Sequence, residues 1–204
     1  MKTIIKNATL LAETGYGEGK WNLVIENKRI VSITKELPDA IGAEVIDAKG
    51  NLLIPGFYNA HTHAAMTLFR GYGEDLPLGR WLEERIFPAE DRLNYENVTI
   101  ATRLAIAEML KGGIVSFSDM YMFEDAVAEV VLETGMKANL SRALVSFSPD
   151  ANIANDNRFA EAKALVEKYQ NADDERVKVD FSLHAEYTKL PHYIAQVGAY
   201  TVAN

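Results

Sequence analysis

The chain has 204 residues, 48% of them hydrophobic and 25% charged, and its 21 Lys and Arg residues against 29 Asp and Glu give a formal net charge of −8. This length suits one domain or two small ones, and an acidic chain without a Lys- or Arg-rich run is a poor candidate for binding nucleic acid or an anionic membrane. The absence of cysteine excludes disulfides, thiolate nucleophiles and cysteine-based zinc sites, so any metal must bind through His, Asp, Glu or Lys.

The sequence contains no apolar stretch of signal-peptide length and none approaching the roughly 20 apolar residues of a membrane span. Charged residues interrupt the N-terminal segment early, at Lys2 and Lys6. We therefore expect a cytoplasmic protein whose partners are small molecules or other proteins, with no nucleic acid and no membrane among them.

Residues 1–54 have the alternating pattern and short turns of β structure. Strands are predicted at Thr3–Leu11, Trp21–Glu26, Arg29–Thr34 and Glu44–Ile46. The second and third of these flank Asn27-Lys28, a two-residue connection in which Asn27 can take a positive φ, so we predict a hairpin. Together these residues are expected to form a small N-terminal β-sandwich module.

After Pro55-Gly56 the pattern changes to short apolar strands that alternate with helices, which is typical of βαβ units and a parallel sheet. The strands are predicted at Phe57–His61, Ile114–Ser118, Ala138–Val145 and Val177–His184. Helices are predicted at Leu78–Phe87, Tyr95–Lys111, Glu124–Thr134, Phe159–Gln170 and Pro191–Ala203. Asn94 is the expected N-cap of the second helix, Gly112-Gly113 ends it, and Gly135 closes the third helix where a left-handed residue is favoured.

The number of βα units matters for the architecture. Four units are half of an eight-stranded βα barrel, which typically takes roughly 250 residues, whereas residues 55–204 supply 150. The pattern by itself therefore leaves open a smaller open sheet or a barrel that stops midway.

The strongest local motif is the sequence PGFYNAHTH at residues 55–63. Side chains two apart in a strand point to the same face, so His61 and His63 can hold one metal ion from a rigid backbone. At the C-terminal end of a strand they would face the mouth at which barrel enzymes keep their active sites. The spacing alone is equally compatible with two histidines that merely cap a strand.

In its context this motif closely resembles the first barrel strand of the amidohydrolase superfamily, which contains metal-dependent hydrolases of amide and amidine bonds. The resemblance continues through segments along nearly the whole chain. They are Met66–Gly71, Asp75–Leu78, Trp81-Leu82, Phe87–Glu90, Glu108–Leu110, Asp119–Tyr121, Ser141-Arg142 and His184–Thr188. Together they are similar to the methylthioadenosine/S-adenosylhomocysteine deaminase group, in the branch that also contains chlorotriazine hydrolases.

This resemblance implies an α/β fold, a (β/α)8 TIM-type barrel of which residues 55–204 would be the first half, with four βα units. It also implies hydrolytic deamination, in which a metal-activated water attacks the carbon that bears an exocyclic amine and a carboxylic acid protonates the departing ammonia. His61 and His63 match the first two ligands of one divalent metal ion. Zinc is the expected ion, with iron or nickel as alternatives.

Four further residues match substrate-binding positions of that group. Glu90 matches a carboxylate that accepts hydrogen bonds from ribose hydroxyls, and His184 matches a histidine that hydrogen-bonds the purine ring. Arg142 and Arg158 match positions that can take a substrate carboxylate, for which guanidinium has a paired geometry. Plainer alternatives are a solvated Glu90 in a turn, a surface Arg158 in a polar loop and a His184 satisfied by a backbone carbonyl, whereas Arg142 in an apolar strand needs a partner or a polar cleft.

The acid/base of that group, its third metal histidine and its metal aspartate have no counterpart in these 204 residues, so no catalytic residue is assigned. Two histidines leave zinc short of the three protein ligands that are usual in catalytic sites. We therefore expect an N-terminal fragment of a deaminase that is inactive or nearly so alone. Its exposed strand edges are expected to favour homo-oligomerisation or association with a missing C-terminal half.

Two other functions stay open on the sequence. One is an amidohydrolase acting on a triazine, guanine or cytosine-like ring, and the other is a non-catalytic half-barrel binding module that keeps Glu90 and His184. The presence of both Arg142 and Arg158 favours a small-molecule nucleoside substrate that carries a carboxylate, such as S-adenosylhomocysteine.

Overall fold

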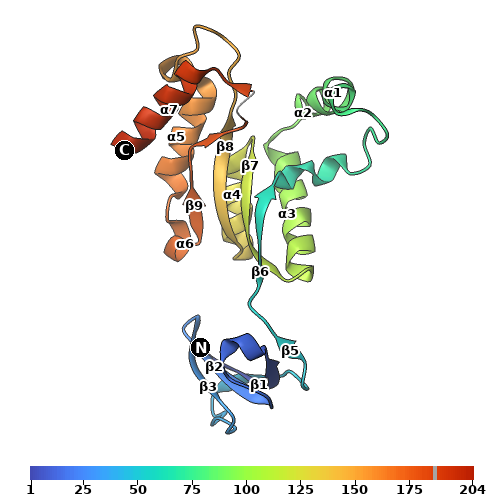
Figure 1. Cartoon of the computed structure of the whole chain (residues 1–204), viewed down its shortest axis with the longest axis vertical. Coiled ribbons are helices and arrows are strands. Elements are labelled where there is room, and N and C mark those ends of the chain that lie inside the picture. Colours follow the sequence, from blue (N-terminus) through green and yellow to red (C-terminus); the bar gives the residue numbers. More distant parts are fainter. Residues whose placement is uncertain (186–187) are drawn as a thin grey trace. The chain divides into compact units, whose positions relative to one another are not determined.

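The computed structural model describes residues 1–185 and 188–204, which form two compact units, Met1–Gly56 and Phe57–Asn204 (Figure 1). The first unit consists of β strands and one 3-10 turn, and the second combines a parallel sheet with helices. Within the described residues, no helix combines the length and the apolar character needed to cross a bilayer.

The first unit is a five-stranded mixed sheet built around β1 (Lys2–Leu10). Its other elements are β2 (Trp21–Glu26), β3 (Arg29–Thr34), β4 (Ala43–Asp47), β5 (Leu52–Leu53) and a 3-10 turn at Ala12–Thr14. β1 pairs antiparallel with β2 and parallel with β4 and β5, while β3 pairs with the other edge of β2. Ile4 and Ala8 of β1 and Leu23 of β2 are buried.

The four strands predicted in this unit are present, each within one residue of its predicted ends. The hairpin between β2 and β3 is confirmed, and both Asn27 (φ 49°) and Lys28 (φ 67°) take the positive φ that matches the twist of paired strands. β5 was not predicted, because two residues are too short to produce an alternating pattern. The arrangement of these strands as a sandwich stays a prediction.

The second unit contains a parallel sheet in which successive strands lie side by side. Its strands are β6 (Phe57–Thr62), β7 (Ile114–Tyr121), β8 (Lys137–Leu144), β9 (Val177–Val179) and β10 (Ser182–Leu183). β6 pairs with β7 and β7 with β8, and both β9 and β10 pair with β8. The predicted α/β class with a parallel sheet is therefore confirmed.

The prediction of one continuous strand at Val177–His184 is wrong, because β9 and β10 are separate. Both keep the same register along β8. At the interruption the backbone N–H of Asp180 still donates to the carbonyl of Leu140 (3.0 Å), and Asn139 Nδ2 donates to Asp180 Oδ2 (2.6 Å). Nearby, Ser182 Oγ donates to the carbonyl oxygen of Arg142 (3.3 Å).

Three long helices, α3 (Tyr95–Lys111), α4 (Glu124–Thr134) and α5 (Asn157–Tyr169), pack against the sheet and against their neighbours (Figure 1). The shorter elements and the last helix are a 3-10 helix at Ala64–Phe69, α1 (Leu78–Trp81), a π-helical turn at Leu82–Ile86, α2 (Phe87–Glu90), a 3-10 turn at Ile153–Asn155, α6 (Ala172–Glu175) and α7 (Pro191–Ala203). Asn94 caps α3 as predicted, because its side chain accepts from Asn97 N (3.0 Å) while Asn97 Oδ1 accepts from Asn94 N (2.9 Å).

The helix predicted at Leu78–Phe87 is longer and less regular than expected. It runs through the π-helical turn into α2 and ends at Glu90. Pro88 has no backbone N–H, and just before it Phe87 N reaches back five residues to the carbonyl of Leu82. The irregularity places Glu90 at the end of this segment.

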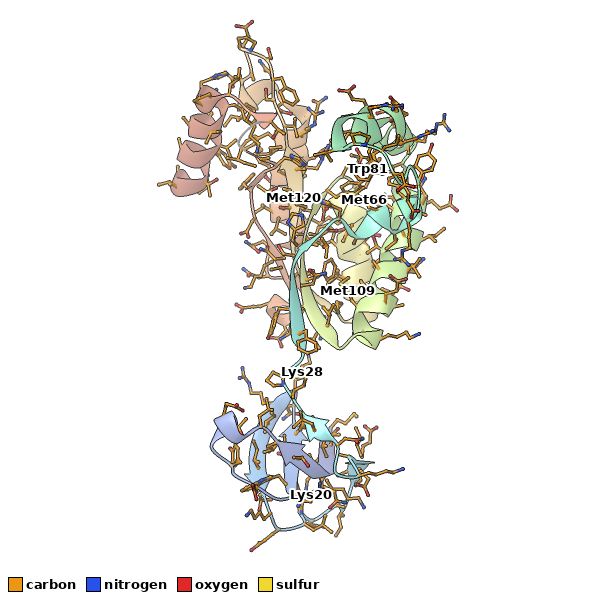
Figure 2. All side chains as sticks on the ribbon, turned by 45° about the vertical axis from the view of Figure 1, so that its right-hand side comes forward. Lys20, Lys28, Met66, Trp81, Met109 and Met120 are labelled. Atoms are coloured by element: carbon orange, nitrogen blue, oxygen red, sulfur yellow. The ribbon has the colours of Figure 1, made fainter. Side chains whose placement is uncertain are left out.

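The main hydrophobic core lies between the sheet and helices α3 and α4. Its fully buried members include Val98, Ala101, Ile106, Phe117, Val127, Val131, Leu140 and Val177. Met109 of α3 belongs to this core, and Met66 of the 3-10 helix at Ala64–Phe69 packs against it (Figure 2). A second cluster joins Leu144 and Phe159 to Tyr193 and Val197 of α7.

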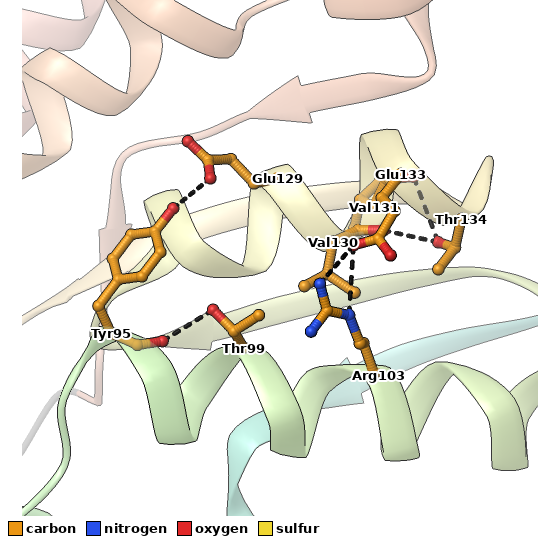
Figure 3. A network of polar contacts seen from close by, with 8 residues as sticks. All are labelled: Tyr95, Thr99, Arg103, Glu129, Val130, Val131, Glu133 and Thr134. Atoms are coloured by element: carbon orange, nitrogen blue, oxygen red, sulfur yellow. Dashed lines mark hydrogen bonds and ion pairs between the residues drawn. The ribbon is translucent and has the colours of Figure 1, made fainter.

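Polar contacts connect the outer surfaces of α3 and α4 (Figure 3). Tyr95 at the start of α3 donates its hydroxyl to Glu129 of α4. Farther along, Arg103 Nη2 donates to Glu133 Oε2 (2.7 Å). These exposed pairs add little stability individually, so their main effect is to fix the alignment of the two helices.

A buried carboxylate joins β6 to β7. Asp119 of β7 has only 1% of its surface exposed, and its Oδ1 accepts from Thr62 Oγ1 (3.0 Å), while both of its carboxylate oxygens accept from Ala64 N (3.1 and 3.2 Å). Oδ1 also accepts from the backbone N–H of Met120 (3.1 Å). Burial raises the pKa of Asp119 to about 6, although these donors favour the ionised form.

Gly135 and Gly198 provide a matched test of backbone conformation. Gly135 closes α4 with φ +74°, and a Cβ there would also lie 2.8 Å from Arg176 Nη1, the end of a flexible side chain. Gly198 lies inside α7 with open space around the position of a Cβ. We expect Gly135→Ala to lower the free energy of unfolding by about 1 kcal/mol and Gly198→Ala to raise it by roughly 0.5–1 kcal/mol. Urea unfolding followed by circular dichroism measures both, and a stabilising Gly135→Ala would contradict the left-handed assignment.

Asp119 should make stability depend on pH. The carboxyl ionises near 3.8 in the unfolded chain and near 6 in the folded one, so the folded protein holds more protons between these values and its free energy of unfolding falls as pH rises through this window. The difference corresponds to roughly 3 kcal/mol at most. Asp119→Asn keeps an acceptor for Ala64 N and should reduce this fall, whereas the contribution of Glu124, a second buried carboxyl with a raised pKa, should remain.

Urea unfolding at several pH values between 4 and 7 would test this expectation. Asp150→Asn, a change at an exposed loop carboxylate, is the control and should leave the fall in place. An unchanged pH dependence in Asp119→Asn would show that this carboxyl is not the group responsible.

Candidate metal and substrate site

His61 and His63 lie together at the C-terminal end of β6. Their ring centroids are 5.1 Å apart, and Thr62 between them directs its hydroxyl to Asp119. The alternation of a strand explains this arrangement, because the residue between two neighbours on one face must point to the other face. Asp119 thus fixes the end of the strand that carries both imidazoles.

The hydrogen bond of His63 indicates which ring nitrogen is available. Its Nδ1 lies 2.7 Å from the carbonyl oxygen of Met120, and because a carbonyl only accepts, Nδ1 carries the proton. Nε2 is then free to bind a cation, with the ring orientation set by a second partner as in most metal-binding histidines. The two imidazoles fit two ligands of a zinc-type ion, although no set of three or more His, Cys, Asp or Glu is grouped for a metal within the described part of the chain.

Glu90 reaches the histidine pair through Tyr121. Tyr121 OH donates to Glu90 Oε1 (2.5 Å), and the Tyr121 ring lies 5.6 Å from the ring of His63. Partial burial raises the pKa of Glu90, while the hydrogen bond from Tyr121 and the nearby His63 oppose the rise. The second carboxylate oxygen, Oε2, takes no part in the bond to Tyr121 and can accept from a ligand.

His184 follows β10, and its backbone N–H donates to the carbonyl of Leu144 (3.1 Å). Partial burial lowers the pKa of His184, and its electrostatic interactions with Lys189, His63 and His61 act in the same direction. Its imidazole is therefore within electrostatic reach of the histidine pair and favours the neutral form. The neighbouring motif residues Glu186 and Tyr187 lie outside the described residues.

Arg142 and Arg158 both line a polar cavity of about 740 Å³. Arg142 lies in β8, and its Nε donates to Glu161 Oε2 (2.5 Å). Arg158 lies in the first turn of α5, where its backbone N–H donates to Asp156 Oδ1 (2.8 Å). The structure thus brings the two predicted arginines to one cavity, which does not include the histidine pair.

A second cavity of about 570 Å³ links Arg142 to Glu90. Both residues line it, together with Glu124 and Glu161. Glu124 is only 2% exposed, and neither of its carboxylate oxygens has a hydrogen-bond partner in the described residues. Burial and the charge of Asp119 raise the pKa of Glu124 well above its usual value, which favours the neutral acid.

Sequence reasoning missed several of these polar groups. Asp119 and Tyr121 belong to a motif that carried the resemblance, but their buried partners are visible only in the folded chain. Glu124 resembles any acidic residue in the first turn of a helix. Lys189 is 6% exposed, and burial lowers its pKa to about 8, although nothing in its sequence surroundings indicates a buried lysine.

Curated relatives are adenosine-type deaminases, and the chain spans a little under half of their length. It is 39% identical over 198 residues to the 5-methylthioadenosine/S-adenosylhomocysteine deaminase of Dictyoglomus turgidum, covering 97% of this chain and 45% of that protein. It is 42% identical over 199 residues to the 5'-deoxyadenosine deaminase of Methanosarcina mazei, covering 95% and 45% respectively.

A solved structure agrees with these relatives. The zinc-bound adenosine deaminase of Xanthomonas campestris superposes with a TM-score of 0.82 at 30% identity, covering 98% of this chain and 47% of that one. Residues 52–199, most of the present sequence, match the amidohydrolase family. The chain therefore belongs to the amidohydrolase family.

Proposed function

We propose that this chain provides part of the active site of a metal-dependent deaminase that releases ammonia from adenosine-type nucleosides. The observation that supports the proposal is the chain of contacts from His63 through Tyr121 to Glu90, because it connects a carboxylate that could accept from ribose to two imidazoles that could hold a metal. The parallel sheet is proposed to be the first four βα units of a (β/α)8 barrel.

The histidine pair would hold the metal through the imidazole nitrogens that the backbone leaves free. A divalent cation, with zinc as the expected ion, would supply a nucleophile by lowering the pKa of a water molecule. The carbonyl of Met120 holds the ring of His63, and Asp119 holds the backbone on either side of it through Thr62 and Ala64. These contacts restrict the ring of His63 before any ligand binds.

The proposed nucleoside would be oriented by groups on three sides. Glu90, held by Tyr121, would accept from ribose hydroxyls through its remaining oxygen. His184, which favours its neutral form, has one donor and one acceptor nitrogen for the edge of a purine ring. Arg142 and Arg158 lie farther off, where a 5' substituent that ends in a carboxylate would reach them.

We expect little ammonia release from these 204 residues alone. The described residues bring two histidines together, whereas catalytic zinc sites usually have three protein ligands and also need a proton donor for the departing amine. Binding of metal and nucleoside therefore gives a stricter test than turnover.

The first measurement is zinc binding. We expect the purified chain to keep near-stoichiometric zinc after dialysis, and His61→Ala or His63→Ala to weaken zinc binding by roughly tenfold or more. His192→Ala removes an exposed histidine from the start of α7 and should have no effect. Competition against a chromogenic chelator measures all four proteins, and equal affinities would contradict the assigned ligands.

The second measurement is nucleoside binding by calorimetry. We expect Glu90→Gln to weaken binding of 5'-methylthioadenosine by about tenfold, because one hydrogen bond to a charged acceptor is lost. Glu83→Gln changes an exposed carboxylate in the same helical segment and should have no effect.

The outcomes separate the competing functions. Nucleoside binding without zinc would favour a non-catalytic binding module, and tighter binding of a triazine, guanine or cytosine ring would favour a different amidohydrolase substrate. Absence of nucleoside binding, with or without zinc, would contradict the proposed function.

A further inference from the structure

The ion pair between Arg142 and Glu161 lies where two cavities meet. Both residues line the cavity of about 570 Å³ that also includes Glu90, and both line the cavity of about 740 Å³ that includes Arg158. A ligand that fills both cavities, from Glu90 towards Arg158, therefore lies against this pair.

The two members of the pair differ in how firmly they are held. Arg142 Nη1 donates to the carbonyls of Tyr121 (3.3 Å) and Ala143 (3.0 Å), and its side chain is 14% exposed. Glu161 is 57% exposed, and its Oε2 accepts from Arg142 Nε at 2.5 Å. Arg142 is thus anchored by the backbone, while Glu161 can turn towards solvent.

The charge of Arg142 is balanced mainly by Glu161. Among the described residues, a further carboxyl close to it is Glu124, whose oxygens have no hydrogen-bond partner there and whose burial favours the neutral acid. The carboxylate of Glu161 therefore lies at Arg142 Nε, on the edge of the guanidinium that a ligand carboxylate would also use.

We propose that Glu161 is a specificity-determining residue, which a ligand carboxylate must displace from Arg142 before it can bind there. A nucleoside without a carboxylate leaves the ion pair intact and meets no such competition. A nucleoside with a carboxylate must break the ion pair, and its own contacts with Arg142 and Arg158 must offset the free energy of the pair. This inference rests on the proposed function, because it assigns the substrate preference of the same site.

A small probe tests the competition without any nucleoside. Propionate is titrated into the full chain while NMR follows the Nε–H signal of Arg142, which is assigned by its loss in Arg142→Lys. In Glu161→Gln the signal should shift at a propionate concentration about tenfold lower than in the unaltered chain. This is the change expected when one competing charge-assisted hydrogen bond is removed. Glu167→Gln, an exposed change on the same helix, should match the unaltered chain.

A nucleoside pair tests the selectivity. The ligands are 5'-methylthioadenosine and an S-adenosylhomocysteine analogue in which hydrogen replaces the α-amino group, so that the carboxylate is its only charge on that side chain. Glu161→Gln should strengthen binding of the analogue by about tenfold. It should change the affinity for 5'-methylthioadenosine less than twofold. S-adenosylhomocysteine itself should follow the analogue.

Three results would overturn the inference. They are an equal propionate response in Glu161→Gln and the unaltered chain, an equal change for the two nucleosides, and a weaker binding of S-adenosylhomocysteine in Glu161→Gln, which would make Glu161 a partner of the ammonium group. If no protein binds either nucleoside, the proposed function fails, and the propionate comparison still decides whether Glu161 competes for Arg142.

Discussion

The buried carboxylate of Asp119 is the constraint on which the candidate site depends. A carboxylate removed from water is costly unless donors surround it, and here the donors come from Thr62, Ala64 and Met120. Two of these residues flank His63, so satisfying the buried acid also sets the path of the backbone that carries the imidazoles. The pH dependence expected for the unit's stability and the geometry of the histidine pair therefore have a common cause.

The end of β7 organises the site through three consecutive residues. Asp119 holds the end of β6, the carbonyl of Met120 accepts from His63 Nδ1, and the hydroxyl of Tyr121 donates to Glu90. The three residues use a side-chain carboxylate, a backbone carbonyl and a side-chain hydroxyl, respectively. One short segment of β7 can therefore form hydrogen bonds both with the end of β6 and with α2. Arg142 on β8 is anchored at the same place, because the carbonyl of Tyr121 accepts from it.

Local sequence patterns were sufficient where structure depends on neighbouring residues. The β2–β3 hairpin, the Asn94 cap and the left-handed Gly135 follow from backbone preferences that act within a few residues. The patterns were insufficient where a side chain or a proline interrupts an element, as between β9 and β10 and in the π-helical turn before Pro88. The hydrophobic periodicity of a sequence shows which residues are apolar. It does not show where the regular backbone hydrogen bonds of a helix or a strand are interrupted.

The sequence by itself determined the α/β class, the alternation that sets His61 and His63 on one face and the acidic, cysteine-free chemistry that restricts metal ligands. Only the tertiary structure decided that Tyr121 joins Glu90 to His63, that Glu161 pairs with Arg142 and that the carboxylate of Glu124 is buried with no hydrogen-bond partner among the described residues. The physical reason is that these contacts connect residues 19 or more positions apart, and their strength depends on burial. Burial is a property of the packed molecule, and no short stretch of sequence encodes it.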